Sequence, residues 1–223
     1  MDNIFLDFIS SRHCKRTYLD KYVPPHLLRA VLAAASNAPS AKNMQCCEVA
    51  VVSGAKRDQL SAALCHAFDA GEPGAADYQY MMKPVDEMYM QRARMCGYNL
   101  FTLKGIGRTD KAARLKHTRE NFTFFNAPVQ MIFHLPANAQ PGMFLDMGCF
   151  IQTVMLAIKA VGLDSCPQFS VARYPDIIRD QLNLGADRLI VNGLSVGYAD
   201  ERALVNTFVP QRLDLEHYVA WYE

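Results

Sequence analysis

Residues 144–162 read FLDMGCFIQTVMLAIKAVG, and this stretch decides how the rest of the chain is organised. Its apolar residues recur every three or four positions, which predicts a helix over Phe144–Val161 with one apolar face. Gly162 then ends the helix. A membrane span needs about 20 apolar residues, and Gln152 and Lys159 interrupt this stretch, so we expect a buried core helix instead.

Shorter elements are predicted on both sides of this helix. The expected helices are Asp2–Arg12, a helix between Pro25 and Pro39, Ala55–Ala70, Asp86–Lys104, Asp110–Glu120 and Arg173–Leu182. The expected buried strands are Cys46–Val52, Pro128–Leu135 and Arg188–Gly197. Helices predominate and the strands lie far apart, which indicates an α+β fold with a small sheet between helices. No linker separates two cores, so residues 1–223 are expected to form a single domain.

The composition narrows the class of protein. Of the 223 residues, 51% are apolar and 20% are charged, as in an ordinary globular protein. The formal charge of +1 argues against nucleic acid or a membrane surface as partner. The N-terminal residues carry no signal-peptide pattern, so we expect a cytoplasmic protein. The seven cysteines contain no C-x-x-C pair, so neither a metal site nor a redox dithiol is expected.

The segment Ser11–Arg16 places two arginines, a lysine and a histidine side by side. Clustered guanidinium groups bind phosphate through charge-assisted hydrogen bonds, although a solvated basic turn has the same composition. A second segment, Ala38–Gln45, follows a helix and offers Ser, Asn and Gln side chains. These groups suit the edge of a heterocycle or the hydroxyls of a sugar chain, and they equally suit a simple turn.

Two later segments complete the set. In Gly162–Phe169, Pro167 fixes one backbone angle, so the amides that follow it could donate to a ring nitrogen; a plain helix-to-strand connection is the alternative. In Asn206–Arg212, Arg212 stands among apolar neighbours and could complete an anion site, although such an arginine is more often a surface charge. The fragment Gly105–Gly107 lacks the strand and the third glycine of a dinucleotide fingerprint.

In this order, the four segments resemble the FMN-dependent nitroreductase family, and the resemblance covers nearly the whole chain. The family has an R-x-S-x-R/K cluster, an A-P-S-x-x-N-x-Q loop, a G-L-x-x-x-P segment and a late basic residue. The matching positions are Arg12–Arg16, Ala38–Gln45, Gly162–Pro167 and Arg212. Residues 121–128, 146–148 and 165–168 resemble the branch that includes nitrobenzoate reductases.

The resemblance implies a fold and an activity. The fold is a small central mixed β-sheet flanked by helices, with a long central helix and a C-terminal tail that embraces a dimer partner. The activity is reduction of nitroaromatic or related electron-poor aromatic compounds by NAD(P)H through bound FMN, in a ping-pong hydride mechanism. The alternatives are quinone or enone reduction, reductive dehalogenation, or flavin binding without turnover. The scheme requires no acid–base side chain, so no catalytic residue is named.

The resemblance also implies cofactor-binding residues. They are Arg12, Arg16 and Arg212 at the phosphate, His13 and Cys14 along the ribityl chain and ring edge, Pro39, Ser40 and Asn43 from the other subunit, Pro167 against the ring, and the amides of Gln168 or Phe169 at the flavin N5. Two positions depart from the family pattern: Cys14 replaces the common Ser, and Pro210 stands where relatives often have Lys.

The tail from Tyr198 to Glu223 carries aromatic and aliphatic residues with little periodicity. A long segment of this kind needs another surface to cover its apolar side chains. We therefore expect a homodimer with two flavins at its interface, and a small aromatic molecule as substrate.

Overall fold

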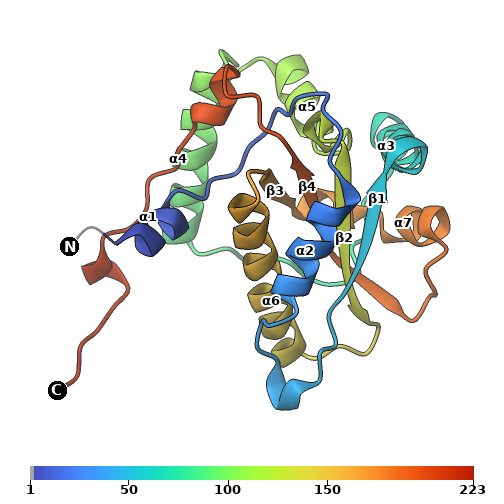
Figure 1. The fold of residues 1–223 in the computed structure, drawn as a ribbon. Coiled ribbons are helices and arrows are strands. Elements are labelled where there is room, and N and C mark those ends of the chain that lie inside the picture. The colour runs from blue at the N-terminus through green and yellow to red at the C-terminus, as the bar shows by residue number, and fades with distance from the viewer. Residues whose placement is uncertain (1–2) are drawn as a thin grey trace.

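The computed structural model describes residues 3–223, in which seven α-helices surround one four-stranded sheet (Figure 1). The helices are α1 (Ile4–Ser10), α2 (Pro25–Ala35), α3 (Gly54–Asp69), α4 (Glu87–Leu103), α5 (Lys111–Arg119), α6 (Pro141–Ala160) and α7 (Pro175–Leu182). The strands are β1 (Glu48–Ser53), β2 (Val129–Pro136), β3 (Asp164–Gln168) and β4 (Arg188–Gly197). Short 3-10 turns are η1 (Ala41–Asn43), η2 (Phe124–Asn126), η3 (Phe169–Arg173), η4 (Leu204–Thr207) and η5 (Leu215–His217).

The predicted helices and the three predicted strands are confirmed within a few residues at each end. Asp2, at the start of the first expected helix, lies outside the described residues. α6 begins at Pro141, one turn earlier than the periodicity indicated, because Pro is favoured in the first turn of a helix. Gly162 ends it with a φ of 75°, which a residue with a Cβ adopts only at a cost.

The sheet corrects one expectation. Its order is β1-β2-β4-β3, and every pairing among residues 3–223 is antiparallel, whereas a mixed sheet was expected. β2 and β3 are connected through α6 and run in the same direction. β4 then inserts between them in the opposite direction, so the two parallel strands never become neighbours.

β3 is the element that the sequence did not predict, because Asp164–Gln168 contains Pro167 and was interpreted as a connection. Proline lacks a backbone donor and is tolerated mainly in edge strands. β3 is an edge strand of the sheet, paired through Pro167 and its neighbours with β4 alone among the named strands.

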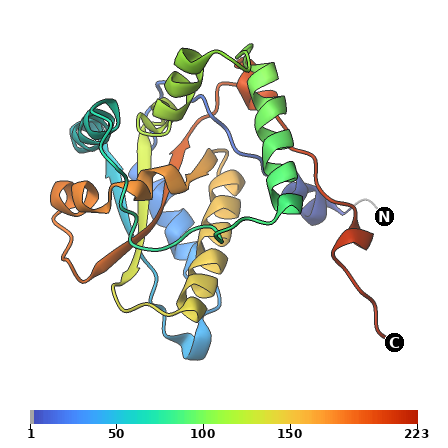
Figure 2. The same ribbon diagram turned by 180° about the vertical axis from the view of Figure 1, so that it is seen from behind.

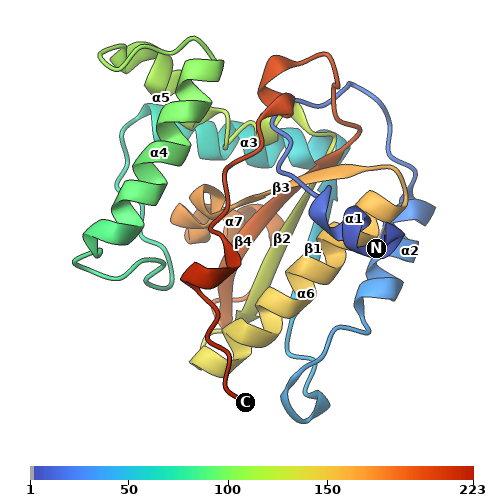
Figure 3. The same ribbon diagram turned by 90° about the vertical axis from the view of Figure 1, so that its left-hand side faces the viewer.

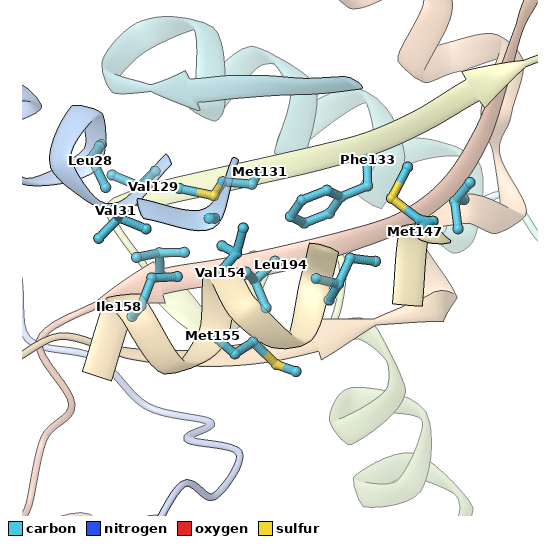
Figure 4. Close-up of a cluster of buried hydrophobic side chains, with 14 of the residues drawn as sticks. Leu28, Val31, Val129, Met131, Phe133, Met147, Val154, Met155, Ile158 and Leu194 are labelled. Atoms are coloured by element: carbon cyan, nitrogen blue, oxygen red, sulfur yellow. The ribbon is translucent and has the colours of Figure 1, made fainter. Parts of the chain in front are cut away.

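Helices cover both faces of the sheet (Figures 1 and 2). α2 and α6 pack on one face, where Met131, Phe133 and Leu194 meet the apolar side of α6 (Figure 4). α3 and α7 lie on the other face. By length and composition alone, α6 is the one helix among residues 3–223 that would be able to span a membrane. Its buried residues Met147 and Val154 pack on the sheet, which confirms the prediction of a core helix.

Two apolar segments lie outside this core. α1 has no buried residue, and its Ile4 and Phe5 side chains are 77% and 75% exposed. The end of the tail projects from the molecule in Figures 1 and 2, on the side that faces the viewer in Figure 3, and Trp221 is 78% exposed. Within one chain, these segments leave a large apolar surface without a covering element.

Candidate functional site

The basic segment predicted from the sequence lies along the free edge of β3. Lys15 N donates to the Ser165 carbonyl oxygen at 3.3 Å, and Leu19 N donates to the Tyr198 carbonyl at 2.8 Å. Tyr18 forms a β-bridge with Ala199, just beyond the end of β4. These contacts hold the first basic cluster against the strand that carries Pro167.

The tail is locked to this cluster through Asn206, which is 4% exposed. Its Oδ1 accepts from Arg16 N at 2.7 Å, and its Nδ2 donates to the carbonyls of Thr17 at 2.7 Å and Asp200 at 2.9 Å. Its carbonyl oxygen accepts from Lys15 Nζ at 2.9 Å. Asn206 is therefore a positioning residue that sequence analysis missed, although it opens the fourth segment.

Cations converge on His13 from three parts of the chain. Burial lowers the pKa of His13, and the positive charges of Arg12, Lys15, Arg212 and Lys159 lower it further. Arg212 comes from the tail and Lys159 from the end of α6. Two of the expected arginines, Arg12 and Arg212, therefore act on the same histidine, together with Lys159, which the sequence analysis did not single out.

Within the described part of the chain, no carboxylate neutralises the arginines of this site. Among residues 3–223, Arg12, Arg16 and Arg212 form no ion pair with a carboxylate. By contrast, Arg179 and Arg119 each pair with an aspartate. Guanidinium groups gathered without a counter-charge suit a bound phosphate, so the residues present fit the phosphate end of FMN.

Cys14 lies in the same positive field. Contact with the Cys166 thiol and the charges of Arg16 and Arg12 lower the pKa of Cys14 to about 6, although burial opposes the shift. The same contact and burial raise the pKa of Cys166 well above its usual value. A hydroxyl at position 14 would be neutral, whereas the lowered pKa favours the anionic form of this thiol.

The end of β3 presents its backbone rather than the Gln168 side chain. Gln168 is buried; its Nε2 donates to the Asn121 carbonyl at 2.8 Å, and its Oε1 accepts from Ser195 Oγ at 2.5 Å. Any contact of Gln168 with a ligand must therefore use its main chain. The Phe169 ring stacks on Tyr80, with 4.0 Å between centroids, and meets the Tyr78 ring edge-on at 5.7 Å.

This aromatic cluster of Tyr78, Tyr80 and Phe169 was not predicted, since both tyrosines stand between the expected helices Ala55–Ala70 and Asp86–Lys104, where no element was expected. Tyr78 is fixed by its hydroxyl, which donates to the Val191 carbonyl at 2.9 Å. Tyr80 remains 58% exposed and is free to meet a planar ligand. Two tyrosines close together within a loop were the signal available in the sequence.

Pro39, Ser40 and Asn43 lie in a different part of the chain. Ser40 Oγ accepts from Gln45 N at 3.0 Å, and Asn43 adopts a left-handed backbone with φ of 56°. Ala41 N donates to the Asp146 carboxylate near the start of α6 at 3.1 Å. Pro39 and Ser40 line a cavity of about 210 Å³ with Phe150.

The expected site residues therefore form two groups at opposite ends of α6. The loop around Ser40 contacts the start of this helix, while Arg12–Arg16 lies along β3, beyond the helix end (Figure 1). A helix of 20 residues is about 30 Å long. A larger groove of about 690 Å³ between α2 and β1 contains none of the expected residues. One chain alone does not assemble all the residues into one site.

In residues 3–223, helices cover an antiparallel sheet, and cations without an ion-pair partner lie along its edge strand. This combination defines an α+β protein suited to an anionic cofactor. The family model of the nitroreductase family matches residues 9–198. The chain belongs to the nitroreductase family, which confirms the resemblance found in its sequence.

The relatives agree over most of their length. The chain is 33% identical to chloronitrobenzene nitroreductase of Comamonas testosteroni, over 96% of this chain and 95% of the relative. It is 35% identical to 4-nitrobenzoate reductase of Pseudomonas putida, over 89% and 87%. Among solved structures, the FMN and NADPH-dependent nitroreductase NfnB of Sphigopyxis sp. strain HMH matches with a TM-score of 0.95 at 30% identity, over 98% of both chains. NfnB of Mycobacterium smegmatis in complex with NADPH gives 0.93 at 33% identity, also over 98% of both chains.

Proposed function

We propose that this protein is an FMN-dependent oxidoreductase that uses NAD(P)H to reduce nitroaromatic or related electron-poor aromatic compounds. One observation carries the proposal: in a chain of the nitroreductase family, the charges of the Arg12 segment, α6 and the tail act together on His13, and no carboxylate among residues 3–223 pairs with Arg12, Arg16 or Arg212. The relatives named above are nitroreductases, and the two solved ones are FMN-dependent. No specific observation favours the quinone, enone or dehalogenase alternatives.

At the phosphate end, Arg12, Arg16 and Arg212 are proposed to donate charge-assisted hydrogen bonds to FMN. Each such bond contributes roughly 1.5–3 kcal/mol. The Asn206 side chain accepts a hydrogen bond from the backbone amide of Arg16, and the Asn206 carbonyl oxygen accepts one from the Lys15 ammonium. Lys15 is therefore assigned to the structure of the loop and not to the phosphate.

At the ring end, His13 and Cys14 are proposed to lie along the ribityl chain and ring edge, with Pro167 against the ring. The main-chain amides of Gln168 and Phe169 are proposed to face the flavin N5. When bound, FMN supplies the transfer of electrons from NAD(P)H to the aromatic acceptor. The chain contributes oriented amides and a positive field, which favour negative charge at the site, and the exposed Tyr80 ring offers a stacking surface for a planar substrate.

The active unit is proposed to be a homodimer in which Pro39, Ser40 and Asn43 reach the flavin of the other subunit. The uncovered apolar surfaces of α1 and the tail support this assembly, and so does Gly148. A glycine inside a helix costs about 1 kcal/mol relative to alanine. A Cβ at Gly148 would meet no atom within 4 Å, so the fold of one chain gives no reason for this glycine. Close approach of a second chain does.

We further propose that the chain is a single domain and that it works in the cytoplasm. Both faces of one sheet are covered by helices from the whole length of the chain, which supports the first point. The seven cysteines are all free thiols, as is typical of a reducing compartment, which supports the second.

The experiment is to release the cofactor of the purified protein by denaturation and identify it by chromatography. We expect FMN, and FAD as the main species would contradict the phosphate assignment. The holoprotein is then reduced anaerobically with NADH or NADPH and mixed with single oxidants. Faster reoxidation by nitroaromatics than by quinones, enones or halogenated aromatics is expected. Bleaching without reoxidation by any of them would identify a flavin-binding protein without turnover.

A further inference from the structure

Cys14 and Cys166 lie on two backbone segments that a hydrogen bond joins. Lys15 N donates to the Ser165 carbonyl oxygen at 3.3 Å, and each cysteine stands one residue away from this bond. The bond therefore holds the backbone of residue 14 close to that of residue 166.

Extended segments joined by backbone hydrogen bonds lie about 4.8 Å apart. Disulfides require about 4.4–6.8 Å between Cα atoms. Cys14 packs against the apolar cluster that Cys166 forms with Tyr18, Phe125 and Ala127, and the contact between the two thiols shifts the pKa of both. The spacing of the two segments therefore suits a bond between these sulfurs.

We propose that Cys14 and Cys166 form a peroxide-reactive pair that closes to an intramolecular disulfide beside the cofactor site. The Cys14 thiolate attacks one oxygen of hydrogen peroxide, the O–O bond breaks, and after protonation water leaves, with Cys14 as a sulfenic acid. The Cys166 sulfur then attacks the Cys14 sulfur. The S–O bond breaks, the Cys166 proton leaves with the hydroxyl as a second water, and the two cysteines together have lost two electrons to the peroxide.

The two cysteines have unequal parts in this reaction. Cys14 is partly exposed and its pKa is lowered to about 6, so it is the nucleophile that meets peroxide. Cys166 is 2% exposed and its pKa is raised, so it is the resolving thiol. Spacing rules for dithiol motifs compare neighbours in sequence and so do not detect this pair. The disulfide also removes the anion next to Arg12 and Arg16, which leaves the site more positive.

The test uses the purified full-length protein, treated with one equivalent of hydrogen peroxide at pH 7.5, alkylated and digested for mass spectrometry. We expect loss of two of the seven thiols and a peptide in which Cys14 is joined to Cys166, reversed by dithiothreitol. Cys14 should react on the order of ten times faster than Cys96, which is exposed on α4, because its thiolate fraction is much larger than that of an ordinary thiol.

Two variants test which cysteines form the disulfide. Cys96→Ser should keep the Cys14–Cys166 bond, and Cys166→Ser should abolish it and leave a sulfenic acid at Cys14 that dimedone traps. Oxidation of Cys96 ahead of Cys14, or a bond from Cys14 to any other cysteine, would overturn the proposal. FMN content is measured on the same samples: the bond without FMN contradicts only the proposed function, and FMN without the bond contradicts only the cysteine pair.

Discussion

Replacement of Arg212 by alanine should weaken FMN binding far more than replacement of Lys15. The Arg212 side chain is exposed, forms no ion pair among residues 3–223, and its charge reaches His13. The Lys15 ammonium instead donates to the Asn206 carbonyl at 2.9 Å. Each replacement removes one positive charge near the site. Comparing the two variants therefore distinguishes a direct contact with the phosphate from general electrostatic attraction.

The magnitude follows from the lost hydrogen bond. A charge-assisted bond contributes roughly 1.5–3 kcal/mol, and about 1.4 kcal/mol corresponds to a ten-fold change in Kd. Because solvent screens an exposed arginine, we expect the lower end of this range for Arg212→Ala, which is an increase in Kd of about ten-fold. For Lys15→Ala we expect less than about three-fold, since only the field is reduced. The Kd of Arg212→Lys should lie between those of the two alanine variants, because lysine keeps the charge but lacks the planar guanidinium group that binds phosphate through two hydrogen bonds.

The assay is titration of the apoprotein with FMN, followed by quenching of flavin fluorescence. Thermal unfolding of each apoprotein serves as control, because loss of the Lys15 contact also loosens the tail. Equal increases in Kd for Arg212→Ala and Lys15→Ala, at equal stability, would refute the assignment of these two side chains.

Three further predictions concern the tail and the cysteines. Truncation after Asp214 keeps the cation cluster and removes the exposed aromatic end. Light scattering should then report a monomer slightly lighter than the 25.0 kDa of the full chain, and a stable dimer would contradict the interface. Asn206→Ala leaves the Arg16 amide and two carbonyls without their hydrogen-bond partner. Denaturant unfolding should show that the free energy of unfolding falls by about 2–4 kcal/mol. A fall of under about 0.5 kcal/mol would contradict the positioning role of Asn206. Alkylation of Cys14 requires the thiolate, and Cys166, Arg16 and Arg12 favour that anion. The alkylation rate should therefore rise with pH through a midpoint near pH 6. A midpoint near about 8.5, the pKa of an ordinary thiol, would contradict the effect of these neighbours.

The sequence predicted most of the fold because its helices and strands have clear periods. The apolar face of α6 and the continuous apolar runs of β2 and β4 are confirmed, since burial depends directly on these patterns. β3 was missed because it is a short edge strand containing Pro167. The antiparallel order was missed because local periodicity does not record which strand inserts between two others.

The candidate site was predicted in part. The charges of Arg12 and Arg212 both act on His13, whereas Ser40 lies at the other end of α6. The roles of these residues toward a cofactor stay predictions. Asn206 and Tyr80 were missed because their importance comes from contacts made at long range in the sequence, which a motif of adjacent residues does not contain.

The hydrogen bonds between Asn206 and the basic loop have a consequence for how the protein is made. Arg16 and Asn206 lie 190 residues apart in the sequence, yet a direct hydrogen bond between them fixes the loop. Because a chain emerges from the ribosome N-terminus first, the basic loop is made long before the residue that holds it. Until Asn206 has emerged, Arg12 and Arg16 are present without this contact. The geometry of the basic loop is therefore completed late in synthesis.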